Sequence, residues 1–158
     1  MTVPRSSELV ETILYRAADT VGDIAAPAIA LFYQRYPECR ALFDHHGTLR
    51  VQDLENDMVS QALYCLMNWC SSPGEVEIVL LGSVPHHADT LNVPPDFYRG
   101  LLMATAEVIA DSIPAKNREE RAVWDALCRE LCAVIEQGSE HLLNRVAGDP
   151  APARLRHP

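Results

Sequence analysis

Residues 80–102 read LLGSVPHHADTLNVPPDFYRGLL, and this stretch decides how the rest of the chain is interpreted. Two adjacent histidines are followed by a polar turn, two prolines and an apolar segment that begins with an aromatic residue. Neutral histidine is the commonest side-chain ligand of metals and the usual axial ligand of haem iron. Val93, Phe97 and Leu101 follow His87 by six, ten and fourteen residues. The stretch therefore predicts a histidine ring in an apolar gap between helices.

The rest of the sequence predicts helices. Apolar residues recur mostly at intervals of three and four, and the alternation typical of strands is almost absent, which indicates an all-α fold. Ser6 or Ser7 is expected to cap a first helix, Asp23 a second helix and Ser72 a later one. The second helix is expected to end before Pro37, because the residue preceding a proline resists the helical region.

Two segments are expected to interrupt the helices. Residues 44–53 are predicted to form a polar turn in which His45 and His46 are solvated. Pro85 removes a backbone donor and is expected to break or restart the helix that precedes His87. The long helix between these two segments is expected to end near Trp69, with an inner side made of Leu54, Met58, Ala62, Leu66 and Met67.

Length and composition favour a single domain. The chain has 158 residues and is 48% hydrophobic, and residues 1–147 are predicted to form one domain followed by a disordered, proline-rich tail over residues 148–158. The net charge of -9 argues against a nucleic-acid partner and against attraction to anionic lipid. No run approaches the ~18 apolar residues of a membrane span, and the N-terminus lacks the apolar core of a signal peptide. These features predict a cytoplasmic protein without a membrane partner.

The cysteines do not form a recognisable framework. Five cysteines without a CxxC motif, in a chain without a secretion signal, favour reduced thiols. Cys128 and Cys132 lie four residues apart and could share a metal, but such residues more often pack as small apolar groups. We therefore expect these two residues to pack in the core.

Three landmarks together resemble a globin. The spacing from His87 to Val93 and Phe97 resembles the end of helix F and the start of helix G. The sequence Tyr-Pro-Glu at residues 36–38, followed by Phe43, resembles the corner between helices B and C, where a phenylalanine packs on the haem. The tryptophan of RAVWDALCREL, residues 121–131, is similar to the opening of helix H in bacterial single-domain globins.

The resemblance implies a globin fold of six to eight helices around a haem b pocket. His87 would be the proximal ligand of the iron, and Phe43, Val93, Phe97 and Leu101 would contact the haem. His86 would point away from the ring, either as an exposed polar residue or in contact with a haem propionate.

The distal side is inferred by counting from Pro37. Ile29 occupies the place where oxygen-avid bacterial globins carry a tyrosine, and Leu54 the place where a distal histidine or glutamine is usual, with Met58 one turn later. These residues predict an apolar distal pocket. The count from Pro37 to Leu54 crosses a loop of variable length. If that loop shifts the register of the helix, Gln61 would replace Leu54 or Met58 in the distal pocket.

Two further features of the sequence would affect the coordination and reactivity of the iron. His45 or His46 could fold back onto it as a sixth ligand. Phe97 stands where flavohaemoglobin-like globins carry a tyrosine that hydrogen-bonds to their proximal network, and the loss of that hydroxyl should weaken the electron push toward bound oxygen.

Two functional classes follow from the resemblance, and a third lies outside it. The first is a haem protein that reversibly binds or senses a diatomic gas, O2, NO or CO. The second is an NO dioxygenase or another haem enzyme that processes nitrite or NO and is reduced in trans by an external reductase, since the chain has no room for a flavin domain. The third is a haem-free helical interaction protein. The sequence specifies neither the physiological ligand nor the resting coordination, the oligomeric state or a signalling partner.

Overall fold

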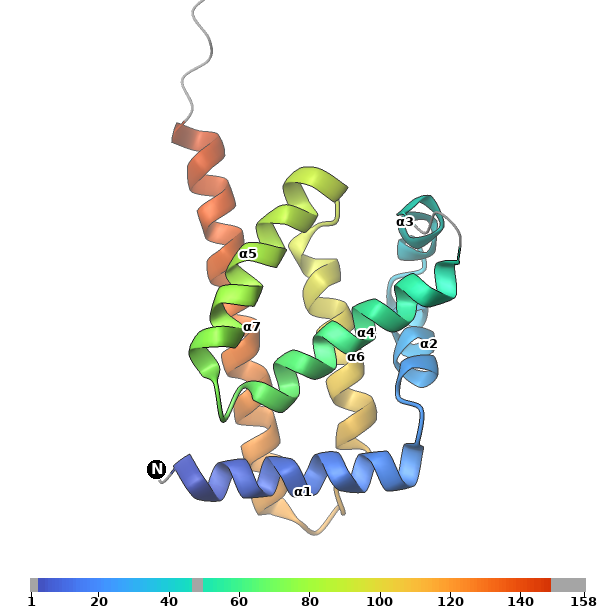
Figure 1. Cartoon of the computed structure of the whole chain (residues 1–158), viewed down its shortest axis with the longest axis vertical. Coiled ribbons are helices and arrows are strands. Elements are labelled where there is room, and N and C mark those ends of the chain that lie inside the picture. The colour runs from blue at the N-terminus through green and yellow to red at the C-terminus, as the bar shows by residue number, and fades with distance from the viewer. Residues whose placement is uncertain (1–2, 47–49, 149–158) are drawn as a thin grey trace, which may run out of the picture.

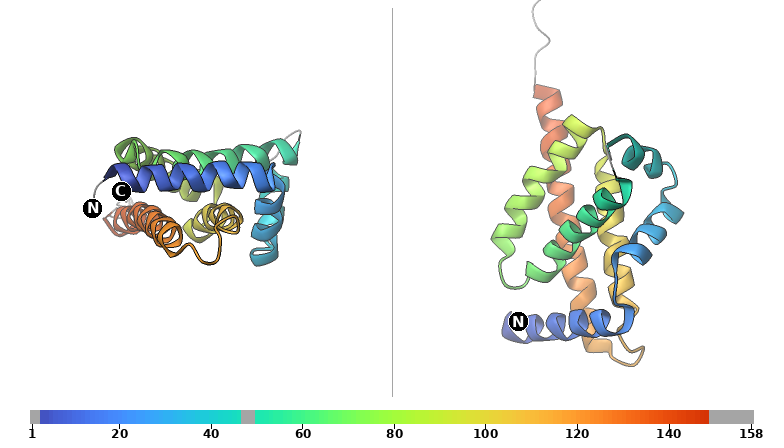
Figure 2. Two further views of the ribbon diagram at one scale, coloured as in Figure 1. Left: turned by 90° about the horizontal axis from the view of Figure 1, so that it is seen from below. Right: turned by 45° about the vertical axis from the view of Figure 1, so that its right-hand side comes forward.

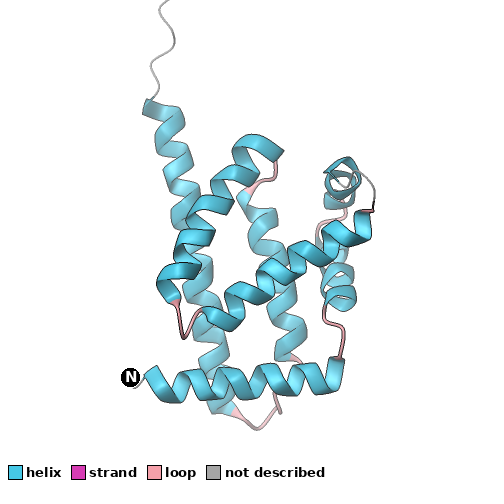
Figure 3. Cartoon of the chain, viewed as in Figure 1, coloured by secondary structure: helices cyan, strands magenta, loops and turns pink. Residues whose placement is uncertain are grey.

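The computed structural model describes residues 3–46 and 50–148, and every regular element within these ranges is an α-helix (Figures 1 and 3). This confirms the all-α prediction. The described helices are α1 (Val3–Val21), α2 (Ala25–Arg35), α3 (Cys39–His46), α4 (Val51–Asn68), α5 (Pro73–Leu91), α6 (Pro95–Ala110) and α7 (Arg118–Gly148).

The helices form two layers. Helix α1 crosses the ends of α6 and α7, while α4 runs diagonally over α6 and α5 lies along α7 (Figure 1). Seen from below, α1 and α4 lie on one side and α6 and α7 on the other, with α2 at one end (Figure 2). None of the helices in the described part of the chain combines the length and apolar character needed to span a bilayer.

The larger core joins both layers. Trp124 of α7 is 1% exposed and donates a hydrogen bond from Nε1 to the carbonyl oxygen of Ala106 in α6, at 3.1 Å. It packs among residues of α1, α4 and α5, including Ile13, Leu66 and Leu80, each fully buried. Trp124 therefore lies on the buried side of the final helix.

A second, smaller core lies at the end of the molecule occupied by α2 and α3. It is built around Phe32 and joins α2 and α3 to α4 and α6. The part of α6 between the two cores is buried on most sides, and Leu101, Thr105, Val108 and Ile109 are all buried. Residues of both cores also line the cavity described in the next section.

Several predicted helix limits are wrong. Helix α1 already begins at Val3, so Ser6 and Ser7 lie inside it rather than at its cap. Most of the predicted polar turn is helical, because α3 continues to His46 and α4 begins at Val51. Met67 was expected inside but is 56% exposed. Polar residues and apolar spacing are weak local signals and do not fix where a helix begins or which residue faces inward.

The expected break at Pro85 is also wrong, because α5 runs through it without interruption. A proline inside a helix loses one backbone hydrogen bond and crowds the preceding turn. Here Pro85 is buried and the adjacent Val84 is 1% exposed. Val84 packs on Gly138 of α7, where an added Cβ atom would lie 3.4 Å from the Val84 Cβ atom. The close packing of α5 on α7 therefore offsets the lost hydrogen bond.

Other limits agree with the sequence. Helix α2 ends at Arg35, before Pro37, and Ser72 lies at the N-cap position of α5. Asp23 accepts a hydrogen bond from the backbone N–H of Ala25 at 3.0 Å, at the start of α2. Helix α7 ends at Gly148, and the predicted tail beyond it lies outside the described residues.

Candidate functional site

A cavity of about 330 Å³ lies between α3, α4, α5 and α6. Phe32 of α2 and Val93 of the α5–α6 connection complete its wall, which is mostly apolar. The cavity brings together all but one of the residues that the sequence placed in a cofactor site: Phe43, Leu54, Met58, His86, His87, Val93, Phe97 and Leu101.

The exception is Ile29. This residue is 8% exposed and belongs to the smaller core, where it packs among residues of α4 and α6. Phe32, nearly one turn further along α2, lies on the cavity wall instead. Counting from Pro37 identified the correct helix but could not determine which of its faces meets the cavity.

His87 is held in a defined tautomer. Its Nδ1 atom lies 2.8 Å from the carbonyl oxygen of Ser83, one turn earlier in α5, and 3.3 Å from the Ser83 hydroxyl. A carbonyl oxygen only accepts, so Nδ1 carries the proton and Nε2 has its lone pair. Within residues 3–46 and 50–148, no hydrogen bond reaches the Nε2 atom of His87. A neutral imidazole in this state is a metal ligand.

The surroundings of His87 favour its neutral form. Burial lowers the pKa of His87 below its ordinary value, and this effect exceeds that of the Ser83 hydrogen bond, which raises it. Charges on His86 and His46 lower the pKa further. His87 is therefore ready to donate its lone pair at neutral pH without first losing a proton.

The end of α5 fixes the residues beside His87. Asn92 adopts a left-handed conformation with φ of 53°, which asparagine tolerates better than most residues. The chain then turns so that the backbone N–H of Val93 donates to the carbonyl oxygen of His87 at 2.8 Å. This C-terminal cap places Val93 in the cavity wall next to the histidine.

Tyr98 is a part of the site that the sequence did not reveal. Its ring lies edge-on to that of His87, with centroids 5.1 Å apart and an interplanar angle of 79°. Burial raises the pKa of Tyr98, and the interaction of its hydroxyl with the Ser83 side chain lowers it by less. Phe97, where the resemblance indicated a lost hydroxyl, also lines the cavity. The next residue thus brings a hydroxyl back to the side of the cavity that holds His87.

The wall formed by α4 carries Leu54 and Met58, together with Gln61. The Gln61 side chain is exposed, so it lies at the rim where water can hydrate it. His46 also lines the cavity, and its Nε2 atom lies 3.0 Å from the carbonyl oxygen of Leu91. This nitrogen must carry the proton in that contact. The described lining includes His46 but not His45, which is exposed.

His86 differs from His87 in its surroundings. Its side chain is exposed and lies at the cavity rim, with its ring nearly perpendicular to that of His87 at a centroid distance of 6.1 Å. A side chain with ring nitrogens at this position can form a hydrogen bond to a carboxylate at the mouth of the cavity.

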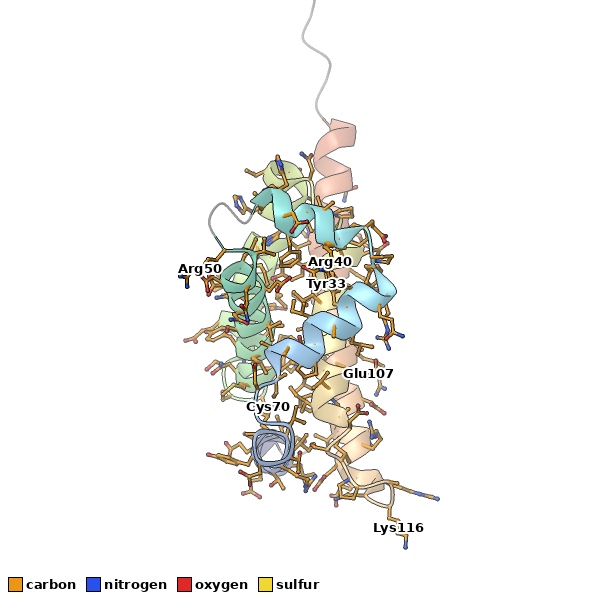
Figure 4. The ribbon with its side chains drawn as sticks, turned by 90° about the vertical axis from the view of Figure 1, so that its right-hand side faces the viewer. Tyr33, Arg40, Arg50, Cys70, Glu107 and Lys116 are labelled. Carbon is orange, nitrogen blue, oxygen red and sulfur yellow. The ribbon has the colours of Figure 1, made fainter. Side chains whose placement is uncertain are left out.

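Phe43 is supported by a cluster of aromatic rings. It lies edge-on to Tyr33 and to Phe32, at centroid distances of 5.8 and 6.3 Å. The hydroxyl of Tyr33 donates to Glu55 at 2.7 Å, and the guanidinium of Arg40 lies 4.7 Å from the centroid of its ring. Figure 4 shows Tyr33 and Arg40 beside each other between α2 and α3. This network connects the Phe43 wall to α4.

Cys39 and Cys65 also line the cavity, but their thiols, unlike the His87 ring, must lose a proton before they can bind a metal well. Burial raises the pKa of Cys39 and that of Cys65 to about 11. Both thiols therefore stay protonated at neutral pH, and a protonated thiol is a poor metal ligand. His87, by contrast, has a ring nitrogen with a free lone pair and needs no deprotonation to bind a metal.

The other cysteine pair lies elsewhere. Cys128 is 7% exposed in the larger core, and the thiol of Cys132 lies 3.5 Å from the sulfur of Met103. Cys128 packs in the core as expected, whereas Cys132 is half-buried and lies outside both cores. In the described ranges no three His, Cys, Asp or Glu side chains form a metal-binding group.

Comparison with protein-family models, with curated proteins and with solved structures returned no match for this chain.

Proposed function

We propose that this chain is a globin that holds haem b through His87 and reversibly binds or senses a diatomic gas. The observation that carries the proposal is the state of His87. Its Nδ1 atom is committed to the Ser83 carbonyl at 2.8 Å, while the residue lines an apolar cavity of about 330 Å³. This combination of one prepared imidazole and an apolar wall suits a flat macrocycle that needs a single protein ligand.

The other residues of the cavity have separate tasks in this proposal. Phe43, Val93, Phe97 and Leu101 would pack against the apolar macrocycle, and His86 at the rim would contact a carboxylate group. When bound, haem iron supplies an open coordination position for a small neutral ligand. Leu54 and Met58 would exclude water from that position and offer no hydrogen-bond donor to the ligand.

A second candidate function is an enzyme that oxidises NO or processes nitrite and receives electrons from an external reductase. The observation that favours it is Tyr98, which lies 5.1 Å from the His87 ring and interacts with Ser83. Partners of a ligating histidine adjust its basicity and so the electron density at the metal. Consumption of NO in the presence of a reductase, followed by stopped-flow absorption, distinguishes this enzyme from a gas-binding protein.

The proposal is tested by reconstituting the purified chain with haem b and recording its ferric, ferrous and CO spectra. We expect a Soret band in the wild type. In His87→Gly the haem should be lost or bound only with added imidazole, which replaces the missing ring. The matched control is His86→Ala, which should keep a normal Soret band.

Two results would count against the assignment. Reversed phenotypes for His86 and His87 would show that the ligand has been placed one residue too late. A wild-type protein that takes up no haem would indicate a haem-free helical interaction protein.

A further inference from the structure

A second cavity of about 290 Å³ lies on the far side of α6, where α6 meets α2 and α7. It has no lining residue in common with the first cavity. Its lining residues are Arg35, Tyr36, Arg99, Gly100, Met103 and Cys132.

Two arginines from different helices line this cavity, Arg35 of α2 and Arg99 of α6. Arg35 uses Nη2 to contact Glu107 at 2.7 Å, and Arg99 uses Nη1 to contact Glu136 at 3.2 Å. The remaining contact of Arg99 is a weak one from Nη2 to Asp96, at 3.7 Å. Among the described residues, the Nε atoms of both arginines and Nη1 of Arg35 make no hydrogen bond. Each arginine therefore keeps donors available for another acceptor.

The carboxylates that pair with these arginines do not line the cavity. Both arginine side chains are 42% exposed, so each is reached by solvent as well as by its partner. Burial raises the pKa of the Cys132 thiol, an effect larger than that of nearby Arg99, which lowers it. The thiol is therefore neutral, and the formal charges on the cavity wall are positive.

The rest of the wall is apolar and shaped by one glycine. A Cβ atom at Gly100 would lie 2.5 Å from Cε2 of Tyr36, so only glycine lets this ring lie against α6. Met103 and Cys132 also line the cavity, with their sulfur atoms 3.5 Å apart. The lining of this cavity therefore combines two arginines with an aromatic ring and two sulfur-containing side chains.

We propose that this second cavity binds a small organic anion, with its phosphate or carboxylate group between Arg35 and Arg99 and its apolar part against Tyr36 and Met103. The planar guanidinium fork matches both of these anionic groups and binds them through charge-assisted hydrogen bonds. A volume near 300 Å³ is at the lower end of small-molecule sites. The site is separate from the His87 cavity, so its test does not depend on haem binding.

The first test measures binding of phenyl phosphate and of benzoate to the full chain by calorimetry, with inorganic phosphate as the probe that lacks an apolar part. We expect phenyl phosphate or benzoate to bind more tightly than inorganic phosphate. Arg35→Gln and Arg99→Gln should each weaken binding about ten- to a hundredfold, the usual effect of losing one charge-assisted hydrogen bond. The matched control is Arg50→Gln, which removes the same charge from a residue that lines neither cavity.

Glu107→Gln separates a binding site from a purely structural ion pair. Removing this carboxylate frees Arg35, so the variant should bind the anion several-fold more tightly than the wild type. If the arginines serve only to connect helices, Glu107→Gln would lose stability without any gain in binding. This variant also keeps the proposal testable if an arginine variant fails to fold.

The thiol of Cys132 gives a readout specific to the cavity. At phenyl phosphate ten times its dissociation constant, alkylation of Cys132 should slow about tenfold by mass action. Cys70, which is also half-buried but does not line this cavity, is the internal control and should react at an unchanged rate. Equal protection of both thiols, or binding that survives loss of both arginines, would overturn the proposal.

Discussion

Two glycines inside helices have opposite surroundings. Gly100 of α6 faces the ring of Tyr36, which is packed against Phe32 and Phe97 at centroid distances of 5.4 and 5.5 Å. Among the described residues, no atom lies within 4 Å of a Cβ atom built at Gly82 of α5. A methyl group therefore meets a fixed ring at one position and open space at the other.

This contrast leads to a stability prediction. Gly100→Ala should lower the free energy of unfolding by about 1–3 kcal/mol, because the aromatic ring cannot move aside without disturbing its neighbours. Gly82→Ala should raise it by up to about 1 kcal/mol, since alanine is the better helix former. Urea denaturation of both variants measures the two changes. Equal effects would mean that Tyr36 can move at little cost.

Phe43 gives a second prediction at the scale of single residues. Removing a buried aromatic side chain costs ~3–5 kcal/mol, and because Phe43 is only half-buried the loss in Phe43→Ala should fall at the lower end. The variant should also lose haem faster, as followed by transfer to an acceptor protein. Tyr15→Ala, at a residue that is 73% exposed, is the control and should change neither property. Normal haem retention in Phe43→Ala would remove Phe43 from the haem contact.

Some cavity residues could be predicted from the sequence because they lie a fixed number of residues from a proline or a histidine. Others reach the cavity only because of the way two helices pack, and these could not be predicted. Phe43 and Val93 were placed by counting from a proline and a histidine, and both line the cavity. Phe32, Ser83 and Tyr98 also line it. Their roles depend on which face of each helix meets its neighbour, and an apolar stripe alone does not specify that face to within a residue.

At the scale of helices, α1 and α7 are joined by an ion pair. Arg16 donates to both carboxylate oxygens of Glu120, at 2.5 and 2.9 Å, and Glu120 is 4% exposed. Asn117 accepts a hydrogen bond from the backbone N–H of Glu120 at 3.1 Å and so satisfies the start of α7. The hydrogen bonds from Arg16 hold the pKa of Glu120 below its ordinary value of 4.5.

The lowered pKa fixes the direction of a pH effect. The folded state binds the Glu120 proton less readily than the unfolded state, so the contribution of this pair is fully present above pH 4.5 and is lost as pH falls through the lowered pKa. Arg16→Ala should cost roughly 1.5–3 kcal/mol at neutral pH, and the difference from wild type should shrink below pH 4. Urea denaturation across this pH range measures it.

The exposed pair of Arg50 and Asp53 is the control for this prediction. Their charged atoms are 3.9 Å apart, and the side chains are 77% and 65% exposed. Arg50→Ala should therefore change stability by less than about 0.5 kcal/mol at any of these pH values. A loss in Arg16→Ala that stays constant down to pH 3 would show that the guanidinium acts by packing alone.

Helix faces were easier to predict than helix limits. Most of the apolar residues that recur at intervals of three and four in α6 and α7 are buried, because an amphipathic pattern repeats over many residues and tolerates a single exception. A limit depends on one or two residues, and Pro85 and the serines at positions 6 and 7 were each overridden by the packing of a whole helix.

At the scale of the whole molecule, the two cavities lie on opposite sides of α6 and are connected by aromatic contacts. Tyr36 lines the second cavity and lies 5.5 Å from Phe97, which lines the first. The first cavity is lined by residues of both cores, so a ligand that fills it would bind only the folded state and raise its stability. If the chain binds haem as proposed, haem should raise the melting temperature, and the chemistry of the cavity should decide which gas binds.

The last prediction concerns that choice. Ligated O2 carries partial negative charge and gains from a hydrogen-bond donor, whereas nearly neutral CO gains little. One such bond is worth ~1.5–3 kcal/mol, or about ten- to a hundredfold in affinity. Leu54 and Met58 provide no donor, Gln61 is exposed at the rim, and the Nε2 proton of His46 is directed to Leu91. We therefore expect fast O2 dissociation, ready autoxidation and comparatively strong binding of CO or NO.

Three variants examine this expectation by stopped-flow kinetics and absorption spectra. Leu54→Gln introduces the missing donor and should slow O2 dissociation about ten- to a hundredfold, in line with the value of a charge-assisted bond, with little change for CO. Gln61→Leu should leave the O2 rate within about twofold, because a hydrated side chain at the rim gives no net stabilisation. His46→Ala should leave a five-coordinate ferrous spectrum unchanged.

A slow rate of O2 dissociation in the wild type that becomes fast in Gln61→Leu would place the Gln61 amide over the iron. A six-coordinate low-spin spectrum abolished in His46→Ala would make His46 a second ligand, and in either case the distal pocket would not be apolar.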